Sequence, residues 1–419
     1  MDIQRLYDIM QWFTAHLMSL YCKLVIYPLR CHTQKKKIAA IRGKEKIKIL
    51  FIVIDLSEWK TESLYERMLT HPRFEPVLGL TMSMESPWEK EKFKSYLESK
   101  KYEYIDLDLM PEAINKIDPD IIFYQKPYSV NYFPRYDYVH NLNRIFCYCP
   151  YSINTIDESW VFHHAMAHYS WQYYYNNDLS MRSAQIHFPS FTKNLVVTGL
   201  PINDNLLQDK QSYPDPWRTV ENKRKRIIYA PHHTIGDLHM DGIAYSTFLT
   251  YSDFMLNMAD KYKDQIQWAF KPHPCLKKRL YQVWGEEKTD TYYQKWADLE
   301  NTQLETGEYV GLFMHSDAMI HDCASFTIEY HYTQNPVLYL VRDEKHTDNL
   351  NDFAKRAFDL HYKARNQQDI EKFINDVIAG NDEMKAERKK FYQECLLPPH
   401  GKSASDNIIN AILGEEEYK

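Results

Sequence analysis

Short, almost wholly apolar segments alternate with helix-length segments along the chain, and this alternation limits the possible folds more than any other feature. The apolar segments of the first half are Lys46–Asp55, Phe74–Thr81, Tyr102–Leu107, Pro119–Pro127, Arg144–Pro150 and Asn194–Thr198. Ser86–Lys100, between two of them, has the length of a helix, and Asp157–His187 is expected to form aromatic-rich helices. Strands without a polar face are typical of parallel sheets covered by helices on both sides. The first half is therefore expected to form a doubly wound α/β domain.

The second half repeats the pattern. Its expected strands are Arg226–Pro231, Gln267–Pro274, Asp317–Asp322 and Pro336–Val341, and its expected helices include Phe248–Tyr262 and Ser325–Tyr332. Two Rossmann-like domains facing a cleft form the GT-B arrangement, and 419 residues suffice for both. We expect an N-terminal helix and basic linker over 1–44, an acceptor domain over 45–208, a nucleotide-donor domain over 209–400 and a C-terminal crossover helix over 401–419.

Composition excludes several functions. Only 11 residues are glycine, and neither GxGxxG nor GxxxxGK[ST] occurs, which argues against a dinucleotide oxidoreductase and a P-loop kinase. The net charge of -6 gives no basic surface for nucleic acid, so no nucleic-acid partner is expected. Seven cysteines without a CxxC pair suit a reducing cytosol.

The first thirty residues predict an amphipathic helix ending near Pro28. Its apolar stripe is spaced by three and four residues and comprises Ile3, Leu6, Met10, Phe13, Leu17, Leu20 and Leu24. Charged residues interrupt this run, so neither a signal peptide nor a membrane span is expected. With Lys35–Lys37 the helix suits a membrane surface contacted through residues 1–37, at the inner face of the cytoplasmic membrane. Docking on the protein's own core or a dimer contact explains the stripe equally well.

Three polar clusters follow three expected strands of the second domain, where the strands' carboxyl ends meet at one sheet edge. His273 stands between two prolines, and Lys271 precedes the first of them. The imidazole can donate a hydrogen bond to a phosphate oxygen, and the lysine adds a positive charge. The segment Asp322–Ser325 precedes a helix whose amides suit a phosphate, with Ala324 leaving them accessible, and Glu329 lies one turn further on, suited to a ribose diol. An ordinary capped helix explains these residues too.

The third cluster contains His232 and His233. Neighbouring side chains of an extended segment point in opposite directions, so we expect one histidine to bind the donor and the other to pack. No HxH or HxxxH spacing accompanies them, and no metal site or cofactor is expected.

Six landmarks in order then resemble the CDP-glycerol glycerophosphotransferases of the teichoic-acid type, over roughly 190–413. They are Gly199-Leu200-Pro201 with Asp204, Tyr229-Ala230-Pro231, Lys271–Pro274, Ser316–Ser325 with Glu329, Asn335-Pro336 and His400–Ser405. The resemblance implies a GT-B transferase that moves glycerol phosphate from CDP-glycerol to a hydroxyl of a glycan, lipid-linked or polyol-phosphate acceptor, with CMP leaving. It also implies that His273 and Ser325 contact the donor pyrophosphate and that Glu329 contacts the ribose.

The acceptor side departs from this family. A Trp-His-Gly motif, whose histidine is taken as the general base, is replaced by Cys147–Ser152. The candidate acceptor-side residues are Tyr151, Ser152 and Asp157. Besides Asp157, the residues downstream that could supply a general base are Glu158, His163, His164 and His168. A nucleotide-sugar glycosyltransferase and a catalytically silent nucleotide-binding or scaffold protein stay open. A metal-dependent GT-A site at Asp106-x-Asp108 or Asp118-x-Asp120 is the weakest alternative.

Overall fold

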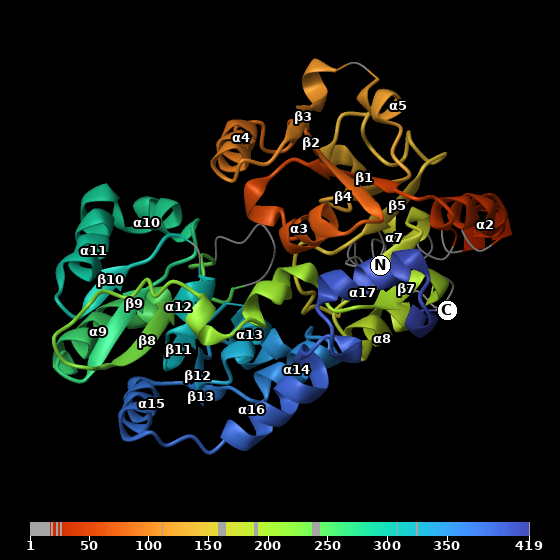
Figure 1. Ribbon diagram of the computed structural model, residues 1–419. Helices are drawn as coiled ribbons and strands as arrows, with labels where there is room; N and C mark the ends of the chain where they lie inside the picture. Colours follow the sequence, from red (N-terminus) through yellow and green to blue (C-terminus); the bar gives the residue numbers. More distant parts are fainter. Residues whose placement is uncertain are drawn as a thin grey trace, which may run out of the picture. The chain divides into compact units, whose positions relative to one another are not determined.

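The computed structural model describes Leu17, Leu20, Tyr21, Leu24, Val25 and residues 27–110, 112–157, 165–187, 192–236, 244–307, 309–323 and 326–418. The chain divides into two compact units (Figure 1). Unit 1 comprises Met1–Asn205 and Leu397–Lys419, and unit 2 comprises Leu206–Leu396.

Unit 1 is built on a parallel sheet, and within the described ranges its strand order is β3-β2-β1-β4-β5-β6-β7. The strands are β1 Ile47–Val53, β2 Phe74–Leu80, β3 Tyr104–Asp106, β4 Ile121–Tyr124, β5 Ile145–Tyr148, β6 Gln172–Tyr175 and β7 Leu195–Val197. The helices are α2 Tyr27–Arg42, α3 Glu62–Thr70, α4 Glu89–Ser99, α5 Ala113–Ile117, α7 Ala165–Tyr169, α8 Asp178–His187 and α17 Ala404–Leu413. The order reverses between β1 and β4, and this switch point is where doubly wound sheets bind ligands.

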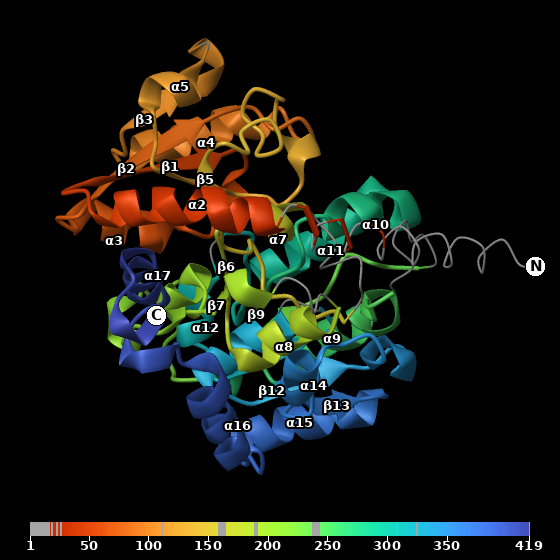
Figure 2. The same ribbon diagram turned by 90° about the vertical axis from the view of Figure 1, so that its right-hand side faces the viewer.

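Unit 2 carries a second parallel sheet with the order β10-β9-β8-β11-β12-β13 in the part of the chain described. Its strands are β8 Lys225–Ala230, β9 Ile266–Phe270, β10 Thr302–Leu304, β11 Ala318–His321, β12 Val337–Leu340 and β13 Tyr362–Ala364. Its helices are α9 Phe248–Lys261, α10 Leu276–Trp284, α11 Glu286–Asp298, α12 Val310–Met314, α13 Phe326–Glu329, α14 Asp352–Phe358, α15 Gln367–Ala379 and α16 Lys385–Phe391 (Figure 2). The predicted α/β class with two doubly wound sheets is confirmed.

Alternate residues of β8 enter two different cores. Ile227 and Tyr229 pack in the cluster that contains α9 and α11, whereas Ile228 and Ala230 pack with α12. Successive side chains of a strand point to opposite faces, so a sheet buried on both sides needs an apolar residue at nearly every position. This requirement is why the strands lack a polar face.

Three strands were not predicted. β6 lies inside Asp157–His187, where helices were expected, so that expectation is wrong for Gln172–Tyr175, whose four residues are all buried. β10 and β13 are three residues long at the sheet's edges, too short for a periodic signal.

The N-terminal region differs from the prediction in its described part. Pro28 lies in the first turn of α2, where backbone N–H groups make no hydrogen bond within the helix, so the missing N–H of proline costs nothing. The helix continues to Arg42. α2 begins at Tyr27, so the expected end of the N-terminal helix near Pro28 is not tested by the described residues. The expected basic linker is wrong at Lys35–Lys37, which are helical. The Arg42 guanidinium fixes the end of α2 by donating to the carbonyls of Ile412, at 2.9 Å, and Ala411, at 3.1 Å. Most of the apolar stripe upstream lies outside the described residues.

Two of the sequence landmarks meet where the chain returns to unit 1. Asp204 accepts hydrogen bonds from the backbone N–H groups of Ala404, at 2.8 Å, and Ser405, at 3.0 Å, at the start of α17. Gly199, at φ 78°, has no room for a Cβ, which would stand 3.0 Å from the Cβ atoms of Ala404 and Pro398. These landmarks therefore fix the C-terminal helix to unit 1.

Candidate functional site

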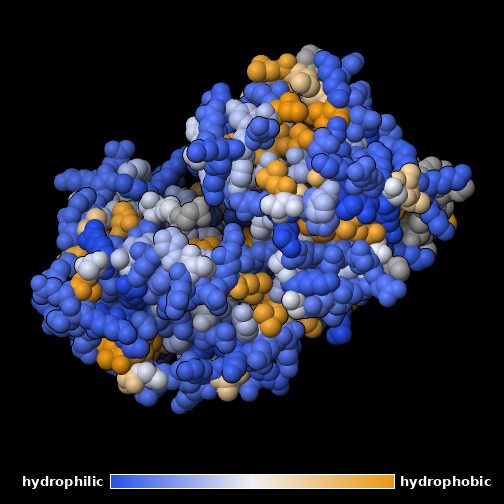
Figure 3. Space-filling view, viewed as in Figure 1, coloured by the Kyte–Doolittle hydropathy of each residue, from blue (hydrophilic) through white to orange (hydrophobic). Residues whose placement is uncertain are grey.

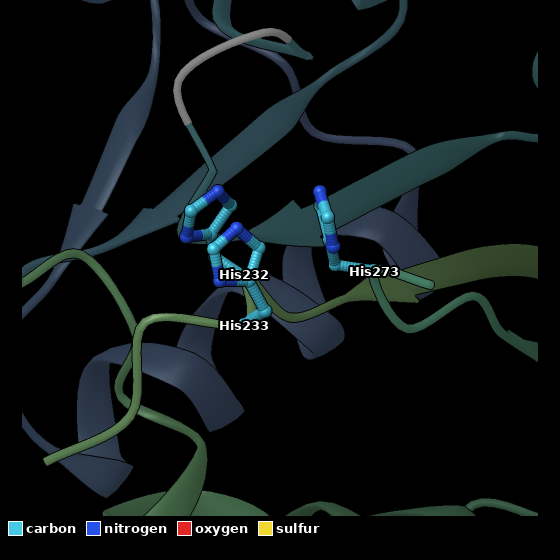
Figure 4. Close-up of side chains that lie close together, drawn as sticks. All are labelled: His232, His233 and His273. Atoms are coloured by element: carbon cyan, nitrogen blue, oxygen red, sulfur yellow. The ribbon is translucent and has the colours of Figure 1, made fainter. Parts of the chain in front are cut away.

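Three histidines gather at the carboxyl ends of β8 and β9 in unit 2 (Figure 4). The ring centroids of His232 and His233 lie 4.2 Å apart, and the His273 ring lies 5.1 Å from the first and 4.1 Å from the second. The expectation that the two neighbours point in opposite directions is wrong, because the chain leaves its extended conformation after β8. We call this group the histidine cluster.

Backbone hydrogen bonds set the register of the cluster. The N–H of Lys271 donates to the Tyr229 carbonyl at 2.8 Å, and the N–H of His273 donates to the Pro231 carbonyl at 3.0 Å. The β9 exit is thus held against the β8 exit, which brings residues 41 positions apart in the sequence into ring contact.

Hydrogen bonds to Nδ1 fix the tautomers of two of these rings. Nδ1 of His273 accepts from the Cys275 N–H at 3.1 Å, and Nδ1 of His232 accepts from the Thr234 N–H at 3.3 Å. A neutral imidazole that accepts at Nδ1 carries its proton on Nε2. His232 and His273 therefore present N–H donors, the groups that a phosphate oxygen needs.

Both imidazoles are neutral at pH 7. Burial, followed by the neighbouring histidines and Arg279, lowers the pKa of His232 to about 2. Burial, His233 and Arg279 lower the pKa of His273 to about 4. Arg279 lies on α10 and was not among the predicted residues; its signal was only its place six residues after His273 in the sequence. Its guanidinium supplies the fixed positive charge near the cluster.

Asp322 lies beneath the cluster and is fully buried. Its carboxylate accepts hydrogen bonds from the N–H groups of His232 and Thr247, each at 2.6 Å, and from the Thr247 hydroxyl at 2.9 Å. Burial outweighs these bonds and raises its pKa to about 6. Asp322, predicted as a donor-binding residue, thus touches the loop that carries His232.

The other predicted donor-side residues are placed as follows. The Lys271 ammonium donates to the Gly307 carbonyl at 2.8 Å, and Glu329 is a buried residue of α13. Ala324 and Ser325 lie outside the described residues, so their predicted roles stay predictions.

A second group of histidines is buried in the core of unit 2. The Ala357 carbonyl, which can only accept, lies 3.0 Å from Nδ1 of His361, so this ring carries its proton there. Nε2 of His361 lies 3.1 Å from Nε2 of His321, whose own Nδ1 lies 3.1 Å from the Cys323 carbonyl. His331 donates from Nε2 to the same Ala357 carbonyl at 2.9 Å. We call His321, His331 and His361 the core histidines; burial lowers the pKa of all three, which keeps the rings neutral at pH 7.

In unit 1, two adjoining pockets open at the carboxyl ends of the strands and share Tyr128 and Tyr151. The first, of about 240 Å³, is lined mostly by tyrosine, proline and isoleucine side chains, and Ser152 also lines it. The second, of about 410 Å³, contains Glu58, Glu85 and Lys126. We call them the tyrosine pocket and the charged pocket.

The remaining acceptor-side candidates lie elsewhere. Asp157 pairs with Nε2 of His187 at 2.9 Å. His168 is buried, and Glu158, His163 and His164 fall outside the described residues.

The alternative metal sites in unit 1 are occupied by cations of the protein. Lys90 pairs with Asp106 and Asp108, at 2.7 and 2.9 Å. Lys44 pairs with Asp120 and Arg144 with Asp118, each at 2.5 Å. Within the described ranges only the histidine cluster has the grouping for a metal ion, with ligand nitrogens within 4.8 Å of one another.

Comparison with known proteins decides the family. The family model described as CDP-glycerol:poly(glycerophosphate) glycerophosphotransferase matches residues 156–414, more than half of the chain. The chain belongs to this family. It is a transferase of glycerol phosphate, as the sequence landmarks indicated.

Solved structures agree on the fold. The wall teichoic acid polymerase TagF is similar at a TM-score of 0.58 and 14% identity, covering 97% of this chain and 99% of that chain. UDP-GlcNAc 2-epimerase from Neisseria meningitidis, bound to UDP-GlcNAc, has a TM-score of 0.57 and 13% identity, covering 88% of this chain and 100% of that chain. The UDP-N-acetylglucosamine 2-epimerase from Listeria monocytogenes has a TM-score of 0.55 and 15% identity, covering 90% and 98%. These likenesses support the GT-B fold; a search of curated protein sequences finds no significant match.

The match to the glycerophosphotransferase family begins at residue 156, after β5. It includes the histidine cluster and excludes Glu58, Glu85, Lys126 and Tyr151. The charged pocket of this glycerophosphotransferase is thus formed by residues that the family model does not cover.

Proposed function

We propose that this glycerophosphotransferase takes CDP-glycerol as its donor and transfers glycerol phosphate to a hydroxyl of a glycan or polyol-phosphate acceptor, with CMP leaving. One observation carries the proposal: the histidine cluster presents Nε2–H donors at the carboxyl ends of β8 and β9, and β8 borders the switch point between β8 and β11. A pyrophosphate is the part of such a donor that needs several hydrogen bonds in one place.

In this proposal the acceptor oxygen attacks the β-phosphorus and the bond to the bridging oxygen of CMP breaks. Charge that develops on the bridging and equatorial oxygens is stabilised by the donors of the cluster and by Arg279. Asp322 holds the His232 loop, so that the donors are in place before the donor substrate binds. Glu329 and the residues near Ser325 remain our candidates for the ribose and the second phosphate.

We also propose that the reaction needs no metal ion. The hydrogen bonds to Nδ1 place a proton on the outer nitrogen of His232 and His273, where a metal would have to coordinate. The fixed donors take the part that a divalent cation plays in other phosphoryl transferases.

Titration and turnover together test the donor. We expect isothermal titration to give saturable binding of CDP-glycerol and CMP, weaker binding of a UDP-sugar, and CMP release when acceptor is added. His273→Ala should lower turnover at least 100-fold while the thermal unfolding temperature stays within a few degrees, because one transition-state donor is lost from a partly buried ring outside the apolar core. His140→Ala, whose ring is 60% exposed in unit 1, is the control.

Other results would assign another function. Preference for a UDP-sugar would favour a glycosyltransferase, and the absence of nucleotide binding would leave a scaffold protein. Full turnover by His273→Ala would remove this residue from the mechanism.

We further propose that the N-terminal stripe contacts a membrane surface, at the inner face of the cytoplasmic membrane. Leu17, Leu20 and Leu24 are each more than half exposed although they share one helical face. Among the described residues no helix combines the length and the apolarity that a bilayer crossing requires.

A further inference from the structure

The charged pocket holds a lysine between two glutamates. The Lys126 ammonium lies 2.8 Å from Oε2 of Glu58 and 3.2 Å from Oε2 of Glu85, and its side chain is only 7% exposed. Two carboxylates against one ammonium leave a net charge of -1. Burying a lysine ammonium costs desolvation free energy, and pairing with carboxylates offsets only part of this cost. The group of Lys126, Glu58 and Glu85 is therefore kept in the pocket although its burial costs free energy.

The position of Glu58 is fixed by its own turn. It ends the 3-10 turn Leu56–Glu58 that follows β1, and Asp55 caps this turn by accepting from the Ser57 N–H at 2.9 Å. The buried Gln125 amide accepts from the Ile54 N–H at 2.6 Å and from the Asp55 N–H at 3.1 Å, which ties the exit of β1 to the end of β4. The carboxylate thus stands at the switch point of the unit 1 sheet.

Glu85 and Lys126 are held with similar precision. The Asn131 amide donates to Oε2 of Glu85 at 2.9 Å, and the Lys126 N–H donates to the Tyr132 hydroxyl at 2.7 Å. Exposure differs within the group: the Glu58 side chain is 26% exposed and the Glu85 side chain 64%. Glu58 is therefore the carboxylate enclosed by the pocket.

The tyrosine pocket beside it suits a sugar. Tyr148 and Tyr173 meet at a ring-centroid distance of 5.0 Å, and Tyr173 stacks on Tyr175 at 5.1 Å. The C–H face of a sugar ring packs on such aromatic walls, while its hydroxyls reach polar groups at the rim. In the adjoining charged pocket, the carboxylates of Glu58 and Glu85 can accept hydrogen bonds from sugar hydroxyls. Their net negative charge repels phosphate groups.

We propose that Glu58 is the general base of the transfer, acting on a hydroxyl of an uncharged sugar residue held in the tyrosine pocket. This inference rests on the proposed function and names the base that the missing Trp-His-Gly motif leaves open. The acceptor O–H proton passes to the Glu58 carboxylate, the oxygen forms the new bond to the β-phosphorus, and the electron pair of the broken P–O bond leaves with CMP. Lys126 is a positioning residue that sets the proton affinity of Glu58.

The electrostatic surroundings suit this task. Burial raises the pKa of the Glu58 carboxyl, and the Lys126 ammonium lowers it in part. Asp55 on the same loop and Glu85 across the pocket add to the rise, and the hydroxyls of Tyr132 and Tyr151 face the same carboxylate. A carboxylate with a raised pKa draws the proton of a hydroxyl more strongly.

The test compares Glu58→Gln with Glu75→Gln, an exposed glutamate of β2 in the same unit. CMP release is followed with CDP-glycerol and two separate acceptors, a neutral N-acetylhexosamine oligosaccharide and a glycerol phosphate oligomer. We expect transfer to the oligosaccharide, a kcat at least 100-fold lower for Glu58→Gln, KM and CDP-glycerol binding within threefold, and full activity for Glu75→Gln. Glu58→Asp should retain part of the activity.

The pH profile separates a base from a merely structural glutamate. The acid limb of kcat should vanish in Glu58→Gln and move to higher pH in Lys126→Met, because the removal of the ammonium raises the pKa of Glu58. A wild-type enzyme that releases CMP while Glu58→Gln retains its rate overturns this inference and leaves the proposed function intact. Transfer to the glycerol phosphate oligomer alone overturns the acceptor class.

Failure of the proposed function has a different signature. If wild type releases no CMP with either acceptor, titration of the oligosaccharide still tests the pocket. Saturable binding that Tyr151→Ala weakens at least tenfold supports the sugar site, and no saturable binding overturns it.

Discussion

The partner of Nδ1 decides what each histidine of unit 2 can do. In the histidine cluster Nδ1 accepts from backbone N–H groups, so the proton stands on Nε2 and is available to a ligand. Among the core histidines, the ring of His361 donates from Nδ1 to the Ala357 carbonyl, so its proton is used within the core. Identical side chains are thereby assigned either to a substrate or to the core.

The tautomers of the histidine cluster predict that removal of metal ions leaves the activity unchanged. Enzyme dialysed against EDTA should release CMP at its original rate, because the protonated Nε2 atoms of the cluster act as hydrogen-bond donors and not as ligands. The measurement is CMP release before and after dialysis, with Zn²⁺ or Mg²⁺ added back. Activity that is lost with EDTA and restored by one metal would assign the cluster to that metal, through the nitrogens that lie within 4.8 Å.

The sequence placed the cluster correctly but not its geometry. His273 and His232 were predicted at strand tips because apolar strands end immediately before them. The shared direction of His232 and His233 depends on a turn after β8, which no residue pattern announced. Glu58 and Lys126 were missed because each follows a different strand, and only the order of β1 beside β4 brings them together.

Among the elements, long strands were predictable and short ones were not. β1 and β2 are seven residues each and mostly buried, so their apolar runs stand out. β6 reads Gln-Tyr-Tyr-Tyr, and tyrosine combines an apolar ring with a polar hydroxyl, so that hydropathy does not separate such a strand from a helix face. Tertiary burial decides the conformation there.

The exposed leucines of the N-terminal stripe predict binding to a membrane surface. Replacing Leu17, Leu20 and Leu24 together by Ser should shift the protein from the floating vesicle fraction to the bottom fraction in a flotation assay with anionic vesicles, because each exposed leucine contributes about 1.5–3 kcal/mol on burial. Leu109→Ser, at an 82% exposed position of unit 1, is the matched control for loss of surface hydrophobicity. Hydrophobic residues also show on the part of unit 1 that carries α5 (Figure 3). Unchanged flotation of the triple variant would favour docking of the stripe on protein.

For the whole molecule, the core histidines predict instability in acid. Burial lowers the pKa of His321 and His331 to about 3, and that of His361 well below its ordinary value of 6.5. Below pH 6.5 these three histidines are protonated in the unfolded chain but stay neutral in the folded chain. The free energy of unfolding therefore falls as the pH drops towards 3. Each histidine costs up to about 1.4 kcal/mol per pH unit in this window.

Asp322 acts in the opposite direction with one proton. Its folded pKa of about 6 lies above the ordinary 3.8, so it adds stability as the pH falls between these values. Three histidines outweigh it, and the free energy of unfolding measured in urea should decrease from pH 7 to pH 5. His361→Asn, which keeps a donor for the Ala357 carbonyl, should flatten this dependence; an unchanged slope would contradict the assignment.

The hydrogen bonds from Asp204 to the start of α17 have a consequence for biosynthesis. Unit 2 is an insertion between two parts of unit 1, so a ribosome releases every strand of unit 1 long before the helix that completes it. Unit 1 must wait, with its α17 contact surface uncovered, until the whole of unit 2 has been translated. A chain shortened by its last 23 residues would therefore lose the stability of the earlier-made unit, while unit 2 would keep all its own residues.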